Sequence, residues 1–342
     1  MDAVCASHPW QSMYPPLQAH ASGWLAAGGG HRVFWEQCGH PLGLPALFVH
    51  SGPGAGSRPE DRRWFDPQRY RIVLFDQRGA GRSQPPGRTA HNRTAHLLDD
   101  MERLRRHLGI ERWLLLGGSW GATLALAYAQ RHPQRVAALV LRAPFMATAR
   151  ELRWLYGPSG AALHEPAAWR RFCLEGQFPL GVLRQQLRSG QQRLQQQAAR
   201  TWWQWEQALD RAEDAPEHRL DLCALNAAVA TARIGLHYAR HGFWLNGDRL
   251  LRRAERLAGI PGVILQGARD QITPGFSAAR LNRAWSGSKL RLLPDTGHAS
   301  SEPAMAYALV EATDGFAMRA QLWNSTPAVQ PGNGSWTRSP VP

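Results

Sequence analysis

Lysine is nearly absent from this sequence. Lys289 is the single lysine, so arginines supply almost all of the positive charge behind the net charge of +14. Such a skew is typical of codon bias in a genome. The arginines are dispersed through predicted helices, without a long basic block and without a recognition motif of aromatic and basic residues. We therefore predict no nucleic-acid partner.

Cysteines and long apolar runs are also scarce. The four cysteines, Cys5, Cys38, Cys173 and Cys223, lie far apart and lack the paired spacing of a zinc site, so we expect free thiols, a reducing compartment and no metal. No apolar run is long enough to span a bilayer, and residues 1–11 lack the basic start and apolar stretch of a leader. We therefore predict a cytoplasmic protein that does not bind membranes.

One stretch, residues 114–128, organises the rest of the chain. Three leucines run into a serine flanked by Gly117 and Gly121, and an Ala/Leu-rich segment follows. This order predicts a strand, a sharp turn at Ser119 and a helix. Small neighbours let a strained serine project its hydroxyl above a sheet, as in a nucleophile elbow. The five-residue pattern by itself is equally compatible with an ordinary turn, so its context decides.

Strand and helix signals alternate along most of the 342 residues. Besides the strand before Ser119 and the helix after it, strands are expected at 31–38, 45–49, 70–75, 136–141, 262–266 and 289–293. Helices are expected at 94–108, 276–285 and 302–322. This alternation predicts an α/β fold with a mostly parallel central sheet covered on both faces.

The alternation is interrupted in the second third of the chain. Residues 143–255 are rich in Gln, Arg, Ala, Leu and Trp and predict helices, so we expect a helical cap inserted between two parts of one core, 1–142 and 256–322. A cap in this position would lie over the carboxyl ends of the strands, where ligands bind in such folds. Residues 323–342, rich in Pro, Gly, Ser and Thr, are predicted to be a disordered tail.

Two further residues fit a catalytic role beside the serine. A serine hydroxyl is a weak nucleophile until a base takes its proton, and a third group must orient that base. Asp270 and His298 each follow a predicted strand directly, as Ser119 does, so the three should meet at one edge of the sheet. Asp295 and Asp76 compete for the orienting role. We favour Asp270, one element before the histidine, and interpret Asp76 as a turn residue held by local donors.

The negative charge that develops in acyl transfer needs backbone donors. The N–H of Trp120, directly after the serine, is one candidate. The second is the N–H of Gly52 in the glycine-rich loop 50–54, which follows an earlier strand. Chemistry of this kind requires no cofactor, and we predict none.

These features together resemble proline iminopeptidases, cap-bearing α/β-hydrolases that remove an N-terminal proline from peptides. The resemblance spans about residues 14–320, and its motifs lie at 14–16, 35–39, 50–54, 75–83, 117–133, 202–206, 232–234 and 294–303. It implies Ser119 as nucleophile, His298 as base and Asp270 as its orienting acid. It also implies that Glu206 holds the substrate's α-amine and that Phe145 forms a wall of the proline pocket. Without the resemblance, residues 202–206 are better explained as an amphipathic helix with a solvated glutamate.

The departures from the family concern the substrate. Ser51 replaces a glycine of the loop, Gly235 stands where a second amine-binding glutamate is expected, and Ala239 replaces a phenylalanine. We predict a proline iminopeptidase that acts on short peptides with an N-terminal proline. The alternative on the same scaffold is an esterase or amidase that needs no free amine. A non-catalytic binding protein is a third possibility, but the presence of all three triad residues argues against it.

Overall fold

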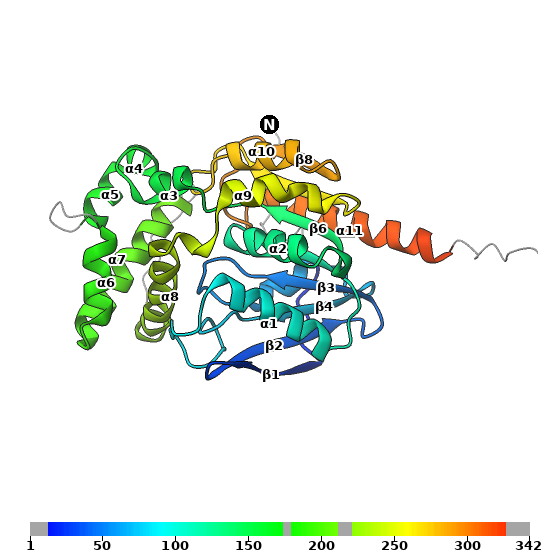
Figure 1. Cartoon of the computed structure of the whole chain (residues 1–342), viewed down its shortest axis with the longest axis horizontal. Helices are drawn as coiled ribbons and strands as arrows, with labels where there is room; N and C mark the ends of the chain where they lie inside the picture. Colours follow the sequence, from blue (N-terminus) through cyan, green and yellow to red (C-terminus); the bar gives the residue numbers. More distant parts are fainter. Residues whose placement is uncertain (1–12, 174–178, 211–220, 326–342) are drawn as a thin grey trace, which may run out of the picture.

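The computed structural model describes residues 13–173, 179–210 and 221–325. In this part of the chain one sheet of eight strands has the order β1-β2-β4-β3-β5-β6-β7-β8 (Figure 1). The strands are β1 (Ala21–Gly28), β2 (His31–Gly39), β3 (Leu44–Val49), β4 (Tyr70–Phe75), β5 (Trp113–Gly118), β6 (Val136–Arg142), β7 (Gly262–Gly267) and β8 (Ser288–Leu293). In this spatial order, every pair of neighbouring strands from β4 through β3 to β8 is parallel, whereas β2 is antiparallel to both β1 and β4. The predicted mostly parallel sheet is confirmed.

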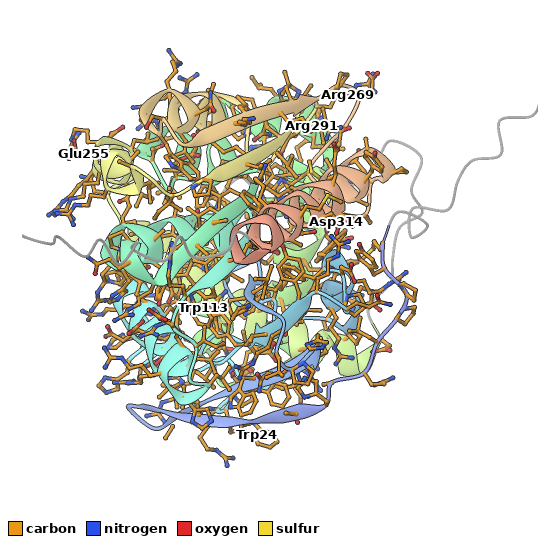
Figure 2. The ribbon with its side chains drawn as sticks, turned by 90° about the vertical axis from the view of Figure 1, so that its right-hand side faces the viewer. Trp24, Trp113, Glu255, Arg269, Arg291 and Asp314 are labelled. Atoms are coloured by element: carbon orange, nitrogen blue, oxygen red, sulfur yellow. The ribbon has the colours of Figure 1, made fainter. Side chains whose placement is uncertain are left out.

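The edge strand β1 is missing from the sequence-based prediction, which begins the sheet at residue 31. This strand is short of large apolar residues, and its residues alternate between half-buried and exposed except for the buried Ala27 near its end. Its tryptophan, Trp24, is 54% exposed at the sheet edge (Figure 2). Glycines 28–30, all with positive φ, form the turn into β2. Pairing with β2, rather than burial, therefore defines this strand.

Helices cover both faces of the sheet. α1 (Thr94–His107), α2 (Trp120–Arg131) and α10 (Phe276–Ala284) pack on one face, and α11 (Pro303–Ser325) packs on the other. The strand β5 shows how the sequence serves both layers, since Leu115 lies in the first core cluster while Leu114 and Leu116 lie in the second. Strands buried on both faces read as continuous apolar runs, which is why they are detectable in the sequence.

The chain between β6 and β7 is helical, and we call it the helical insertion. It contains α3 (Ala149–Tyr156), α4 (Ala161–His164), α5 (Pro166–Phe172), α6 (Pro179–Arg188), α7 (Gln192–Asp210), α8 (Leu222–Arg240) and α9 (Gly247–Arg252). Figure 1 shows α3 to α8 beyond one end of the sheet. The chain also contains four short 3-10 helices within the described residues. They are η2 (Pro59–Trp64), η3 (Pro133–Arg135), η4 (Gly242–Trp244) and η5 (Arg253–Leu257). Of the helices in the described residues, none is both long and apolar enough to cross a bilayer.

Aromatic rings hold the helical insertion together. Trp205 stacks on Phe172 with ring centroids 5.1 Å apart, and Trp202 stacks on Tyr156 at 5.6 Å. Both tryptophans are buried. The amphipathic-helix interpretation of 202–206 is therefore correct for these two tryptophans, which pack on neighbouring helices.

The N-terminal end of the described chain packs against α11 in the second core cluster. Met13 is buried there, and the hydroxyl of Tyr14 donates a hydrogen bond of 2.9 Å to Asp314. Asp314 lies on α11 (Figure 2). Residues 1–12 of the expected arm lie outside the described residues. Of the expected tail, 323–342, only the first three residues are described, and they continue α11. The expected boundary at 322 therefore falls inside a helix.

Candidate active site

Ser119 lies in the turn between β5 and α2. Its φ of 53° and ψ of −120° place a non-glycine residue in a strained region of the backbone. The turn closes only because its neighbours lack side chains, since a Cβ on Gly121 would collide with the carbonyl of Val49 and one on Gly117 with the carbonyl of Gly121. The glycines that suggested a nucleophile elbow are thus required by packing. The same turn places the hydroxyl at the carboxyl edge of the sheet.

His298 and Asp270 form a buried pair at that edge. The Nδ1 of His298 lies 2.8 Å from an Oδ of Asp270. The same carboxylate accepts hydrogen bonds from the N–H groups of Ile272 and Thr273, at 2.9 and 2.8 Å, and from the Thr273 hydroxyl at 2.7 Å. Burial favours the neutral acid, but His298 and the donors of Thr273 outweigh it and lower the pKa of Asp270. A proton held on Nδ1 leaves Nε2 free to act as a base.

The two competing acids have other partners. Asp295 forms an exposed ion pair of 2.6 Å with Arg269. Asp76 accepts hydrogen bonds from the backbone and side chains of Ser57 and Arg82. Arg82 is a local donor, as expected for a turn residue, whereas Ser57 lies 19 residues earlier on another loop. Neither carboxylate is bonded to the histidine.

A cavity of about 200 Å³ joins the residues of the sheet edge to the helical insertion. Ser119, His298 and Gly52 line it from the core. Phe145, at the start of the insertion, and Glu206, on α7, line it from the other side. The structure thus brings together on one cavity five of the seven residues that the sequence proposed for the site. Asp270 lies behind His298, and Trp120 follows Ser119 as the first residue of α2.

A glutamine connects the two candidate oxyanion donors. The Gln77 side chain accepts a hydrogen bond of 2.9 Å from the Trp120 indole and donates one of 2.9 Å to the carbonyl of His50. The Gln77 backbone N–H donates to Nε2 of His50 at 2.9 Å, so this buried imidazole carries its proton on Nδ1 and donates it to Ser51 at 2.8 Å. Burial lowers the pKa of His50, which keeps it neutral. Gln77 thus fixes the loop that carries Gly52.

The oxyanion assignment itself stays a prediction. Gly52 has a φ of +123°, and a Cβ there would meet the backbone nitrogens of residues 54 and 55. The N–H of Trp120 belongs to the first turn of α2, where helical N–H groups lack an intrahelical acceptor. Both positions therefore suit backbone donors.

A second carboxylate lies beside Glu206 on the cavity. Asp210 follows one turn later on α7, and one of its oxygens is buried without a hydrogen-bond partner among the described residues. Burial raises the pKa of Glu206 to about 7, and the negative charge of Asp210 acts in the same direction. Two acids facing one cavity in this state can hold a cation.

The position that lacks the expected glutamate, Gly235, is not among the residues that line this cavity. Gly235 is buried within α8, and a Cβ there would lie 3.1 Å from the Trp202 ring. Ala239 is buried as well. On α8 the cavity is lined by Thr231 instead.

Sequence reasoning missed Gln77, Thr273 and Asp210. Thr273 had a local signal, because an aspartate commonly accepts bonds from N–H groups two and three residues later. Gln77 and Asp210 had none, since their partners lie on distant elements. Among the residues that the structure covers, His, Cys, Asp and Glu form no cluster of three or more that could hold a metal ion.

The fold and this site define the class of the protein. A strained serine after a central strand, with a histidine–acid pair at the same sheet edge, is the arrangement of an α/β-hydrolase. The family model for the alpha/beta hydrolase fold matches residues 45–303. An esterase structure from a Rhodococcus species, at 18% identity, superposes with a TM-score of 0.60 and covers 87% of this chain and 98% of that one.

Curated relatives narrow the class. Proline iminopeptidase from Xylella fastidiosa is 42% identical over 312 residues, which cover 90% of this chain and 99% of the relative. The enzyme of that name from Arabidopsis thaliana is 39% identical over 318 residues, covering 89% and 82%. That from Neisseria gonorrhoeae is 40% identical over 312 residues, covering 88% and 98%. The chain belongs to the proline iminopeptidase family of α/β-hydrolases.

Proposed function

We propose that this protein is a serine aminopeptidase that releases N-terminal proline from short peptides. The observation that carries the proposal is the cavity on which Ser119 and His298 face two carboxylates, Glu206 and Asp210. A nucleophile and its base at one side of a cavity, with a cation site at the other, suit a substrate whose scissile carbonyl lies next to an amine. The full-length similarity to proline iminopeptidases supports the same substrate.

In this mechanism the core residues carry out the acyl transfer. The Ser119 hydroxyl attacks the carbonyl of the N-terminal proline while Nε2 of His298 takes its proton, and Asp270 holds the resulting imidazolium. The N–H groups of Gly52 and Trp120 stabilise the oxyanion. His298 then returns the proton to the departing peptide nitrogen. A water molecule, activated by the same histidine, hydrolyses the acyl-enzyme and releases proline.

The helical insertion recognises the substrate. The N-terminal proline carries a secondary ammonium group, which loses its hydration when it enters the cavity and needs compensation by negative charge. Glu206 and Asp210 supply that charge, so Asp210 takes the part expected of a glutamate at position 235. Phe145 packs against the pyrrolidine ring.

Three substrates test this function against the alternative of an esterase or amidase. We expect purified protein to hydrolyse proline-β-naphthylamide and to lose most of that activity on N-acetylproline-β-naphthylamide, which has no cation. Comparable hydrolysis of both amides, with faster turnover of a short p-nitrophenyl ester, would assign the alternative function.

We also propose that the enzyme acts in the cytoplasm on peptides, without a cofactor. The thiols of Cys38 and Cys173 are free, which supports a reducing compartment. Cys5 and the side chain of Cys223 lie outside the described residues. Fractionation of the native host, with activity followed on proline-β-naphthylamide, tests the location.

A further inference from the structure

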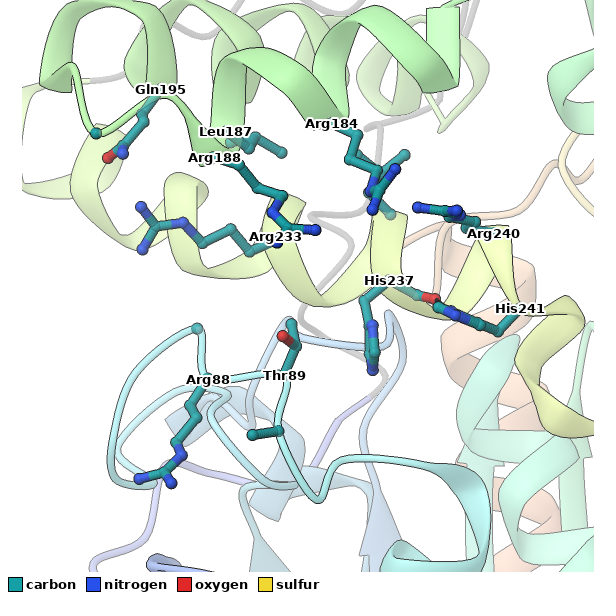
Figure 3. Close-up of a pocket in the computed structure, with 14 residues that line it drawn as sticks. Arg88, Thr89, Arg184, Leu187, Arg188, Gln195, Arg233, His237, Arg240 and His241 are labelled. Atoms are coloured by element: carbon teal, nitrogen blue, oxygen red, sulfur yellow. Dashed lines mark hydrogen bonds between the residues drawn. The ribbon is translucent and has the colours of Figure 1, made fainter.

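A second and larger cleft lies away from the candidate active site. It has a volume of about 770 Å³ and is bounded by α6, by α8 and by the core loop 87–90 (Figure 3). None of the residues that line it lines the cavity of Ser119. The proposed aminopeptidase mechanism makes no use of this cleft.

Basic side chains dominate the lining of this cleft. It contains five arginines and two histidines, namely Arg88, Arg184, Arg188, Arg233, Arg240, His237 and His241, and the described lining residues include no aspartate or glutamate. Figure 3 shows the side chains of Arg184, Arg188, Arg233 and Arg240 around the gap between α6 and α8, whereas Arg88 points away from these helices. We call the four arginines on the helices the arginine cleft.

The arginine cleft is assembled by the fold. Arg184 and Arg188 are one turn apart on α6, while Arg233 and Arg240 are two turns apart on the facing side of α8. More than forty residues of sequence separate the two pairs, so the dispersed charge seen in the sequence converges only after folding. The arginines are dispersed in the sequence, but the fold brings these four to one cleft.

No acid in the described part of the chain neutralises this charge. Elsewhere in the molecule arginines such as Arg62 and Arg78 are bonded to buried carboxylates. By contrast, no ion pair or hydrogen bond within the described residues engages the guanidinium groups of the arginine cleft. Partial burial and the positive charges of Arg240 and Arg188 lower the pKa of Arg184. Like charges four residues apart on a helix, such as Arg184 and Arg188, repel each other, and a bound anion would relieve the repulsion.

Helix ends account for only part of the arrangement. Cations in the last turn of a helix interact favourably with its dipole, and this explains Arg188 on α6 and Arg240 on α8 without any ligand. It does not explain Arg184 and Arg233, which lie before the last turns and face the same cleft.

We propose that the arginine cleft binds a small anion that carries two or more phosphate groups. Guanidinium groups form paired hydrogen bonds with phosphate oxygens, and several of them around one cleft match several adjacent negative charges. A cleft bounded by two helices and a loop suits a small ligand better than a nucleic-acid duplex.

The test uses the full-length protein and inorganic tripolyphosphate in 0.15 M salt, with binding followed by calorimetry and by thermal shift. We expect saturable binding that raises the melting temperature. The triple variant Arg184→Gln, Arg188→Gln and Arg240→Gln should weaken it at least about tenfold, as expected when charge-assisted contacts are lost.

A matched control separates a site from general charge. Arg249, Arg253 and Arg256 also lie close together, on α9 and η5, but line no part of the cleft. Changing these three to glutamine removes the same charge and should alter tripolyphosphate affinity by less than about twofold. Equal weakening in both triple variants, or no saturable binding by the wild type, would overturn the proposal.

Two additions complete the design. Hydrolysis of proline-β-naphthylamide by each variant verifies that the variant is folded. If the triple variant is unstable, Arg188→Gln alone replaces it in the binding measurement. Binding of ATP and AMP, measured without metal ions, tests whether a nucleotide can supply the phosphates. Tighter binding of ATP than of AMP supports a polyphosphate site, and equal binding of the two contradicts it.

Discussion

Two acids of this molecule, the buried Asp270 in the core and the half-buried Glu206 in the helical insertion, have opposite environments. Asp270 is surrounded by donors from His298 and Thr273, and its pKa is lowered. Glu206 faces a cavity beside Asp210, and its pKa is raised to about 7. The catalytic acid is thus complete within the protein. Glu206 and Asp210 form no ion pair within the described residues, and we propose that the substrate supplies their cation.

The largest effect should come from removing the nucleophile. Ser119→Ala should lower kcat for proline-β-naphthylamide at least about 10⁴-fold, because the triad acts as a unit. The melting temperature should not fall, since the strained turn is held by its glycines and not by the hydroxyl. A serine-directed phosphonate should label the wild type and not the variant. Substantial turnover by Ser119→Ala would exclude this serine as the nucleophile.

Asp270→Asn should come next, with kcat lowered about 10³- to 10⁴-fold, because an amide no longer stabilises the imidazolium or enforces the tautomer of His298. KM should change little. The matched control is Asp295→Asn, which removes an exposed acid close to the histidine in sequence and should leave kcat unchanged. Loss of activity in the control alone would reassign the orienting acid.

The difference between the core and the helical insertion also explains how much of the site the sequence could predict. Ser119, Asp270 and His298 each come soon after a strand, and parallel strands bring such positions to one edge of the sheet, so residue order and type were enough to predict them. The role of Asp210 depends on how α7 packs over that edge, which no local pattern encodes. β1 lacked a hydrophobic signal, and the arginine cleft depends on two helices facing each other.

A change at Gly235 tests where the amine lies. Gly235→Glu should lower the stability of the protein by about 1–3 kcal/mol, because its side chain must displace the buried Trp202 ring. It should give no gain on proline-β-naphthylamide. Chemical denaturation measures the first effect and steady-state kinetics the second. A well-folded Gly235→Glu enzyme with improved activity on free-amine substrates alone would place the amine at α8 rather than near Asp210.

The smallest expected effect is on stability as a function of pH. The folded pKa of Glu206, about 7, lies above the reference value of 4.5. Between these values the folded state keeps a proton that the unfolded state releases, so this group's contribution to stability falls as pH rises through that window. The melting temperature of Glu206→Gln, relative to wild type, should therefore increase from pH 5 to pH 8. Glu255→Gln, at an exposed position, should show no such trend.

The central claim is that the core performs the chemistry while Glu206 and Asp210 recognise the substrate's amine. The most direct measurement is kcat/KM for proline-β-naphthylamide and for p-nitrophenyl acetate, in Glu206→Gln, in Asp210→Asn and in the double variant. We predict that each single change lowers the first value about 10- to 100-fold, as for a lost charge-assisted hydrogen bond, and leaves the ester within about twofold. Equal losses on both substrates would contradict the claim and make these acids structural, with Asp210 serving the nearby buried Arg142.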